Sequence, residues 1–530
     1  MTATPDCSPC LSEITMLARL SLVSLSLSFA LMTSPVMGQL EAPADVQVGF
    51  GHDSGWAQND GAPGSAPEVV ISFPVVYPGA TSMRLYFDQV ELSGNLLAGT
   101  GSIVRITSLS DGAVQTLDAG HLIQWQNSSA YFNGAGVQVD VLAYPSTGSN
   151  RVQLHHLDVG VPQFVPESQC GPEDDRQPSN DPRVSRLLPV GCTSWTIDDC
   201  GNCMLSAGHC VGFINLVEFN VPFSTSSGAY GHPGPEDQYA VDSNSIQSNG
   251  GQGVGNDYAY FGCFANPMTG KTAFEAQGSA FGLDLAPSPS SGATIRITGH
   301  GTDSTPNQTF NQVQQTHSGP LTTNTGNTLK YVVDTTGGNS GSPVIWEEAN
   351  VAVGIHTHAG CSTSGTGANQ GTSMSLPGLQ NALANPKGIC RVGGPGGIFT
   401  DLGNGLVAAP FVNTPVLTAC GKLLDNSLLR LNLSVESVPG ATLVSTLVVG
   451  LTQVDSPFKG GVLVPNPDVL VPGLTFNTQA APLDATQQLS VIYPAGMPSG
   501  MSIFIQQWVE VSGLASPVLL ASNGLAITKP

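Results

Sequence analysis

The sequence predicts an all-β protein that is built from several domains. Glycine (63 residues) and proline (39 residues) are abundant, and only 10% of the 530 residues are charged. Short runs in which apolar and polar residues alternate recur towards both ends of the chain, which is typical of β-strands. The composition disfavours long helical bundles, and the helix signal is limited to residues 376–385. At roughly 150 residues per domain, the chain is long enough for about three domains.

Charge and hydropathy exclude two classes of protein. The 38 acidic and 16 basic side chains leave a formal net charge of -22. A chain without a basic patch cannot displace the counterions of nucleic acid, so we expect no nucleic-acid partner. Hydrophobic residues make up 40% of the sequence, which is too large a share for a disordered chain.

The first 38 residues have the pattern of a secretory signal peptide. Arg19 precedes a 13-residue apolar run from Leu20 to Met32, and the small residues Val36 and Gly38 suit signal peptidase. A membrane-spanning helix needs about 20 apolar residues, so this run is too short to be an anchor, and we expect no membrane span. The sequence therefore predicts a protein that is secreted to the extracellular space or the periplasm, and it leaves the oligomeric state open.

The regions on both sides of the middle of the chain predict β-sandwiches. Between residues 45 and 160, alternating runs such as 69–73 and 137–142 are separated by turn residues, as in an antiparallel β-sandwich. This pattern is similar to the CUB-like or jelly-roll accessory domains of secreted bacterial peptidases. Residues 161–188 are rich in Pro, Asp, Glu, Asn and Arg and predict a linker, whose exposed Arg side chains are candidate processing sites. Residues 411–530 predict a second, C-terminal sandwich-like domain.

Three short motifs in the middle of the chain carry the residue types of one catalytic mechanism. They are LSAGHC around His209, GNDYA around Asp257 and GGNSGSPV around Ser340. A serine hydroxyl is a poor nucleophile at neutral pH, so Ser340 needs a neighbouring base to take its proton. His209 suits this role because the unperturbed pKa of histidine lies near neutral pH. A buried carboxylate at Asp257 would fix the tautomer of the imidazole and stabilise the imidazolium that forms.

These motifs resemble those of the trypsin-like serine endopeptidases of the chymotrypsin fold, and they occur in the family's chain order of His, Asp and Ser. The resemblance covers residues 189–392. It implies a double β-barrel, a polypeptide substrate, an acyl-enzyme formed on Ser340, and no metal or organic cofactor. The glycines of the third motif would let the N–H groups of Gly338 and Ser340 point at the developing oxyanion.

One residue departs from the pattern of the digestive trypsins. Asn339 stands immediately before the nucleophile, where those enzymes have an Asp that pairs with a newly cut N-terminus. We therefore expect no activation by that ion pair. The Gly-Asn-Ser-Gly-Ser form is similar to the bacterial glutamyl endopeptidase branch, which also matches the sequence 354–356 (Gly-Ile-His). By the same resemblance, the hydroxyl of Thr357 would bond to Asp257.

The motifs leave two interpretations of substrate preference open. Asp334 lies six residues before Ser340, where trypsins carry the Asp that binds Lys or Arg side chains. Thr335 and His356 match positions at which the glutamyl enzymes hold a substrate carboxylate. We expect a preference for acidic residues before the scissile bond, although the negative charge of the chain opposes encounter with acidic substrates. The alternative for His356 is a histidine of the core.

Nine cysteines follow the expected signal peptide, and export favours disulfides among them. By the family resemblance, Cys192 pairs with Cys210 and locks the turn that carries the catalytic histidine. A bridge between Cys361 and Cys390 is the next pairing that we expect, and Cys420 is the candidate for an unpaired thiol. The remaining cysteines stay unassigned, namely Cys170, Cys200, Cys203 and Cys263.

Two other functions compete with the protease. The first is a secreted binding or adhesion protein whose protease-like barrel is inactive; the intact triad motifs argue against it. The second is a zinc hydrolase built on Cys200, Cys203 and His209. The serine-protease motif already accounts for His209, and export favours disulfides over zinc thiolates.

Overall fold

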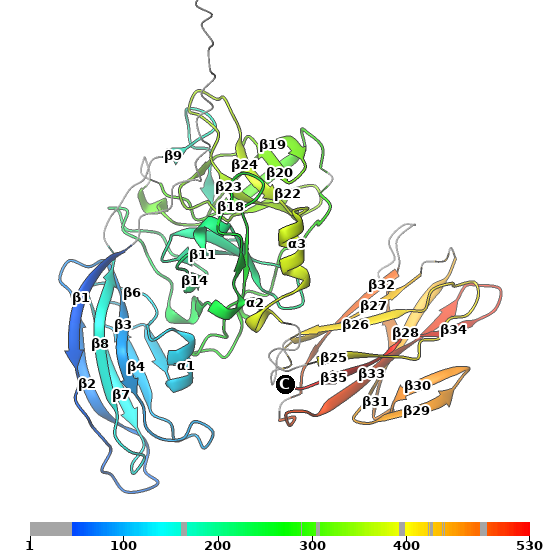
Figure 1. The fold of residues 1–530 in the computed structure, drawn as a ribbon, viewed down its shortest axis with the longest axis horizontal. Helices are drawn as coiled ribbons and strands as arrows, with labels where there is room; N and C mark the ends of the chain where they lie inside the picture. The colour runs from blue at the N-terminus through cyan, green and yellow to red at the C-terminus, as the bar shows by residue number, and fades with distance from the viewer. Residues whose placement is uncertain are drawn as a thin grey trace, which may run out of the picture. The chain divides into compact units, whose positions relative to one another are not determined.

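The computed structural model describes residues 45–530 except 161–166, 288, 304–307, 392–397, 422, 424–427, 437, 439, 477–484 and 495. The expected signal peptide, residues 1–38, lies outside the described residues. The regular secondary structure of the described residues is mainly strands that pair in sheets, running from blue through green to red in Figure 1. The prediction of an all-β protein is confirmed.

Two antiparallel four-stranded sheets form the N-terminal sandwich. Residues along β4 alternate between half-buried and buried positions, which is the period of a sheet with one face on a core. A short helix, α1 (Ala119–Gln124), follows β5 and contributes Leu122 to this core. The strand order of one sheet is β1 (Val46–Asp53), β8 (Arg151–Val159), β3 (Ser82–Glu91) and β6 (Phe132–Asn133). The strand order of the other sheet is β2 (Glu68–Val76), β7 (Gly136–Ala143), β4 (Ile103–Ser108) and β5 (Val114–Leu117).

The first sheet of the middle region forms a half-barrel of seven short strands. It contains the chain segments that precede and follow two of the three sequence motifs. Its strand order is β15 (Gln238–Ala240), β14 (Leu216–Glu218), β11 (Val184–Leu188), β12 (Cys192–Thr196), β13 (Met204–Ser206), β17 (Ala259–Phe261) and β16 (Gln247–Ser248).

The second sheet of the middle region closes on itself. Its strand order is β10 (Gln177–Pro178), β19 (Gln315–Thr325), β18 (Thr294–Gly299), β22 (Pro343–Trp346), β23 (Val351–His358), β24 (Asn369–Ser373) and β20 (Thr328–Tyr331). Because β19 also pairs with β20, six of these strands make a closed barrel. The two sheets together are the chymotrypsin-like double β-barrel that the motifs predict.

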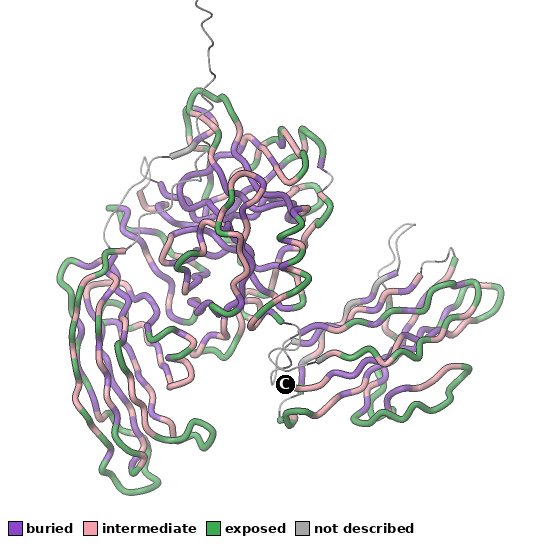
Figure 2. The backbone as a smooth tube through the Cα atoms, viewed as in Figure 1, coloured by how far each residue is buried: buried purple, intermediate pink, exposed green. Residues whose placement is uncertain are grey.

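Apolar side chains of the strands fill the interior of both sheets. Figure 2 shows the buried residues, in purple, along the strands and the exposed residues, in green, mostly in the connecting loops. Two short helices, α2 (Ala273–Gln277) and α3 (Pro377–Ala384), pack on this core through Ala273 and Leu379. Among the described residues, no helix has the length and apolar character that a membrane crossing requires.

The segment that the composition assigns to a linker contains barrel structure. Strand β11 is buried along its whole length and pairs with β12 and β14. Arg176 and Arg186 are buried, so they are not the exposed processing sites that the composition suggests. The physical reason is that the buried ion pair between Arg186 and Glu218 lets a charged sequence lie inside the sheet.

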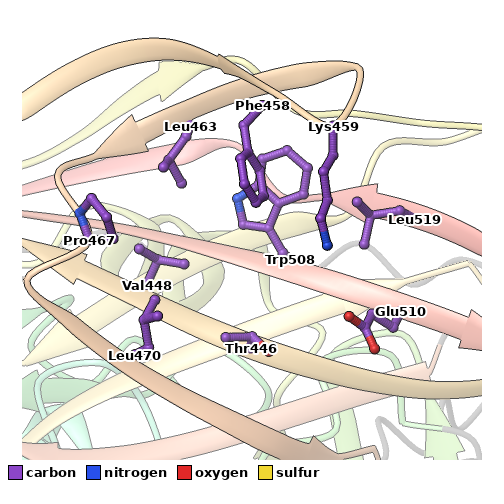
Figure 3. A pocket seen from close by; sticks show the side chains of 10 residues that line it. All are labelled: Thr446, Val448, Phe458, Lys459, Leu463, Pro467, Leu470, Trp508, Glu510 and Leu519. Atoms are coloured by element: carbon purple, nitrogen blue, oxygen red, sulfur yellow. The ribbon is translucent and has the colours of Figure 1, made fainter.

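The C-terminal region is a second sandwich with a core of its own. Within the described residues, it holds a cavity of about 260 Å³ between the sheet and a hairpin, where the rings of Phe458 and Trp508 meet edge to face (Figure 3). The strand order of the main sheet is β25 (Ile398–Gly403), β35 (Gly524–Thr528), β33 (Ser502–Ser512), β28 (Thr442–Gly450) and β31 (Val469–Thr475), and β34 (Val518–Ala521) pairs with β33. A second sheet has the strand order β26 (Val416–Gly421), β27 (Leu428–Val435) and β32 (Ala485–Ile492). Strands β29 (Gln453–Phe458) and β30 (Gly461–Pro465) form the hairpin.

The described residues form three disulfides, Cys170–Cys361, Cys192–Cys210 and Cys203–Cys390. The expected bridge between Cys361 and Cys390 is therefore wrong. The segment at Cys170 runs beside that at Cys361, since the Gly171 N–H donates to the Ser362 carbonyl. Cys420, the expected unpaired thiol, is outside these three bridges, as is Cys200.

Peptide mapping of the non-reduced protein tests this connectivity. We expect the three linked peptide pairs Cys170–Cys361, Cys192–Cys210 and Cys203–Cys390, because each pair is in bonding contact in the folded chain. Detection of a peptide that joins Cys361 to Cys390 would contradict the structure.

Candidate active site

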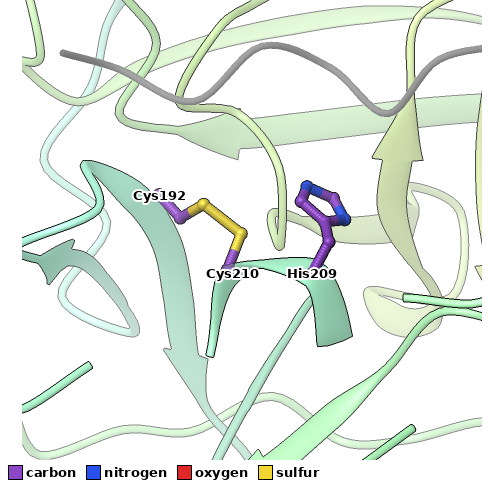
Figure 4. A group of neighbouring side chains, drawn as sticks. All are labelled: Cys192, His209 and Cys210. Carbon is purple, nitrogen blue, oxygen red and sulfur yellow. A yellow bond between two sulfur atoms is a disulfide. The ribbon is translucent and has the colours of Figure 1, made fainter. Parts of the chain in front are cut away.

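His209 lies in a single turn of 3-10 helix, η1 (Gly208–Cys210), directly after strand β13. The disulfide between Cys192 and Cys210 ties this turn to strand β12, and Figure 4 shows the His209 ring beside it. Gly208 has no room for a side chain, because a Cβ there would lie 2.7 Å from the Tyr258 carbonyl oxygen. The turn is thus fixed covalently on one side and by close packing on the other.

Asp257 is buried, and both oxygens of its carboxylate bind the turn that carries His209. Oδ1 accepts hydrogen bonds from the N–H groups of Gly208 (2.5 Å) and His209 (3.2 Å). Oδ2 lies 2.6 Å from Nδ1 of His209. This contact fixes the ring orientation and places the proton on Nδ1, which leaves Nε2 as the basic nitrogen.

The loop that carries Ser340 lies against the same turn. The Thr193 N–H donates to the Ser340 carbonyl (2.9 Å), and the sulfur of Cys210 lies 3.9 Å from that oxygen. The Gly341 N–H donates to the carbonyl of His356 (2.8 Å) in strand β23. The structure thus brings the Ser340 main chain next to the turn of His209.

The side-chain atoms that would exchange a proton make no hydrogen bond in the structure. Ser340 Oγ and His209 Nε2 are both shielded from solvent, and neither has a hydrogen-bond partner in the described part of the chain. Buried polar groups normally have partners, and catalytic groups are a recurrent exception. Catalytic hydrogen bonds are often absent or long until a substrate is bound.

The expected oxyanion donors lie on a turn that requires glycine at position 338. Gly338 has a φ of +98°, and a Cβ at this position would lie 2.3 Å from Gln312 Nε2 and 2.5 Å from the His300 carbonyl. Only glycine fits here. Within the described residues, the N–H groups of Gly338 and Ser340 donate to no protein acceptor.

The carboxylate of Asp334 is already occupied by protein donors. Oδ1 accepts from the Cys170 N–H (2.6 Å), and Oδ2 accepts from the Asp175 N–H (2.9 Å). The residue is buried. A free acid that could pair with a substrate Arg or Lys is therefore not present at this position.

Thr335 and His356 are both buried near the loop of Ser340. The hydroxyl of Thr335 accepts from Asn369 Nδ2 (2.9 Å). His356 Nδ1 lies 2.7 Å from the Tyr331 hydroxyl. Burial, with smaller contributions from neighbouring histidines, lowers the pKa of His356 to about 3, so that the ring is neutral at physiological pH.

The hydroxyl of Thr357 does not make the expected bond to Asp257. It lies 2.8 Å from Nδ1 of its neighbour His358. A different hydroxyl bonds to the main chain of Asp257: Thr372 Oγ1 accepts a hydrogen bond from the Asp257 N–H (3.1 Å). Thr372 lies on strand β24, and nothing in its local sequence marks it.

The side chains proposed for zinc do not form a thiolate cluster. Cys203 is bonded to Cys390, and the two sulfurs nearest His209 belong to the disulfide of Cys192 and Cys210 (Figure 4). Zinc binds cysteine as the thiolate. A disulfide offers none, so the residues present do not fit a zinc centre.

Thr193 is a positioning residue that the sequence motifs do not reveal. Its hydroxyl donates to the Gly338 carbonyl (2.9 Å) and accepts from the His300 N–H (2.9 Å). Its main chain holds the carbonyl of Ser340. The only local sequence signal at this position is the neighbouring Cys192, which forms the bridge to Cys210.

No family model matches the sequence, and no curated protein matches it. Among solved structures, the chain is similar to a Glu endopeptidase in complex with MPD, at 21% identity and a TM-score of 0.32, covering 41% of this chain and 100% of that one. A thermostable serine protease, AL20, from an extremophilic microorganism is 14% identical, with a TM-score of 0.29 and coverages of 39% and 100%. A mutant of human heparin binding protein (CAP37) is 14% identical, with a TM-score of 0.31 and coverages of 40% and 98%.

Substitution of Thr193 tests the two hydrogen bonds by which its hydroxyl holds the Gly338 carbonyl and the His300 N–H. Thr193→Val removes the hydroxyl and leaves the buried Gly338 carbonyl and the buried His300 N–H without partners. We expect the free energy of unfolding to fall by about 1–3 kcal/mol. Thr193→Ser keeps the hydroxyl and should lose less. Equal stability of the Val and Ser variants in denaturant titrations would show that the two hydrogen bonds contribute nothing.

Proposed function

We propose that this protein is a secreted serine endopeptidase in which Ser340, His209 and Asp257 form the catalytic triad. One observation carries the proposal: the Asp257 carboxylate lies 2.6 Å from His209 Nδ1, so that Nε2, which has no hydrogen-bond partner among the described residues, is left as the base. Three disulfides support export to an oxidising compartment.

In the proposed reaction, His209 and Ser340 carry out each proton transfer that peptide-bond hydrolysis through an acyl-enzyme requires. Ser340 Oγ attacks the carbonyl carbon of the scissile peptide bond while His209 Nε2 takes the hydroxyl proton. The N–H groups of Gly338 and Ser340 stabilise the oxyanion of the tetrahedral intermediate, at about 3–4 kcal/mol for a donor. His209 then protonates the leaving amine, the C–N bond breaks, and an ester of Ser340 remains. Water, deprotonated by His209, hydrolyses this ester and restores the enzyme.

The buried carboxylate of Asp257 supports the proposed role of His209 as the base. A carboxylate removed from water is costly unless it is hydrogen-bonded, and Asp257 is satisfied by the turn that it orients. It stabilises the positive charge that His209 acquires during the attack. The resulting imidazolium is short-lived, and its proton passes to the leaving group.

We propose further that the enzyme favours acidic or amide side chains over basic ones before the scissile bond. The Asp334 carboxylate is engaged by two main-chain N–H groups, which argues against its use for a substrate Arg or Lys. His356 and Thr335 are the candidates for contact with an acidic side chain. Because burial keeps His356 neutral, it would act by hydrogen bonding rather than by charge.

Loss of either central residue should abolish turnover. Ser340→Ala and His209→Ala should each reduce kcat on the order of 10⁶-fold, because the nucleophile or its base is missing. Ser342→Ala is the matched control, since Ser342 is a buried serine two residues away whose hydroxyl has no role in the triad. Its kcat should stay within a few-fold of the unaltered enzyme. Full activity of Ser340→Ala would sink the proposal, and absence of activity in the unaltered chain would favour the non-catalytic binding protein.

The pH dependence of specificity tests the protonation state of His356. The ratio of kcat/KM for a peptide with Glu before the cleaved bond to that for Gln cancels the titration of His209. If His356 had the usual pKa of about 6.5, this ratio would fall as pH rises from about 6 to about 8. With the pKa lowered to about 3, we expect a flat ratio over this range. A preference for Arg peptides over both would overturn the proposed specificity.

A further inference from the structure

The loop that carries Ser340 is held by a chain segment that precedes the barrel. Strand β9 (Glu167–Ser168) pairs antiparallel with β21 (Thr335–Thr336), four to five residues before the nucleophile. Within the same segment, the N–H groups of Cys170 and Asp175 donate to the two carboxylate oxygens of Asp334. We call residues 167–178 the strap. The bridge from Cys170 to Cys361 anchors it covalently.

The strap places a buried guanidinium against this loop. Nη1 of Arg176 donates to the Thr336 hydroxyl (2.7 Å), and Nη2 donates to the Thr302 carbonyl (3.0 Å). The Thr336 hydroxyl donates to the same carbonyl (2.8 Å). The Arg176 guanidinium, the Thr336 hydroxyl and the Thr302 carbonyl are thereby joined in a ring of three hydrogen bonds.

The charge of Arg176 is balanced from within the strap. The guanidinium forms a two-pronged pair with Asp174, with Nε 2.9 Å from Oδ1 and Nη2 2.6 Å from Oδ2. The Arg176 side chain is only 2% exposed. A buried cation is stable only when it is paired and its donors are satisfied. The cation therefore needs no counter-ion from the loop of Ser340.

Arg176 reaches the residue that precedes the nucleophile. A Cβ on Gly301 would lie 2.2 Å from Asn339 Nδ2 and 2.3 Å from both Arg176 Nη1 and Thr336 Oγ1. The amide, the guanidinium and the hydroxyl are thus gathered around one point. The Asn339 N–H donates to the Thr336 carbonyl (3.0 Å), so the position of Thr336 determines that of the turn at Ser340.

We propose that Arg176 is a positioning residue, which with Asp174 holds the Ser340 loop in its reactive conformation in the uncut chain. This inference rests on the proposed protease function. Its consequence is that activity requires no cleavage between the N-terminal sandwich and the barrel. Asn339 carries no charge for a new N-terminus to pair with, and the space beside it is filled by a cation that the chain itself provides.

The chain contains a matched control for this residue. Arg183 forms the same pair with Asp181 two residues before it, with Nε 2.8 Å from Oδ1 and Nη2 2.7 Å from Oδ2. Its guanidinium lies over the Phe281 ring, 3.7 Å from the centroid, and makes no hydrogen bond to the loop of Ser340. Arg183→Met thus removes an equivalent ion pair without touching this loop.

The test uses the full-length chain and the rate at which an organophosphonate labels Ser340. We expect the unaltered protein to be labelled while intact mass shows that the chain is uncut between residues 160 and 188. Arg176→Met should be labelled about 10²-fold more slowly, because a small displacement of the nucleophile has effects of this size. Arg183→Met should be labelled within twofold of the unaltered rate. In Arg176→Ala, added guanidinium ion should restore labelling at least tenfold.

Three results decide the inference. Labelling of Arg176→Met at the unaltered rate, or labelling of the unaltered chain only after it is cut, would overturn it. If Arg176→Met does not fold, as judged by circular dichroism, Arg176→Lys and the guanidinium rescue of Arg176→Ala decide in its place, and absence of rescue in a folded variant counts against it. Failure of the unaltered chain to be labelled, cut or uncut, would overturn the proposed protease function itself.

Discussion

The hydrogen bonds of the buried Asp257 carboxylate are the interactions on which the geometry of the proposed active site depends. It accepts two main-chain hydrogen bonds from the turn of His209 and a third from the ring itself. Removing any of these donors would leave part of a buried charge unsatisfied, which costs several kcal/mol. The orientation of the His209 ring is therefore enforced by the same hydrogen bonds that make the burial of Asp257 tolerable.

The loop that carries Ser340, the proposed nucleophile, is likewise held by buried hydrogen bonds, and these come from two segments of the chain. Thr193 on strand β12 binds the carbonyls of Gly338 and Ser340 from the side of the first sheet. The strap, through Arg176, binds Thr336 from the opposite end of the loop. Both side chains are buried; Thr193 binds main-chain carbonyls, whereas Arg176 binds the hydroxyl of Thr336, and neither contacts the Ser340 hydroxyl. Within the described residues, the Ser340 hydroxyl and the N–H groups of Gly338 and Ser340 have no protein partner, as the proposed nucleophile and oxyanion donors require.

Local sequence was sufficient to predict the β-rich fold and the three motifs around His209, Asp257 and Ser340. Alternation of period two and glycine-rich turns are local signals, and so is a histidine placed directly before a cysteine. The contacts between distant segments were not predictable in this way. Cys170 and Cys361 lie 191 residues apart in the chain and meet only because the strap pairs with the loop of Ser340. The sequence between 161 and 188 has the composition of a linker, because its charges are neutralised by short-range and buried pairs that composition does not reveal. Asp334 shows the same limit: its spacing from Ser340 is that of a specificity residue, whereas its carboxylate serves the strap.

The central claim is that Ser340, activated by His209 and Asp257, forms a covalent acyl-enzyme. Rapid quenching of the reaction with an activated ester, followed by mass mapping of the acylated peptide, tests it most directly. We expect one acyl group per chain, attached to Ser340, and none in a chain that carries His209→Ala. An acyl group on another residue, or a steady turnover of the ester without any acylated chain, would contradict it.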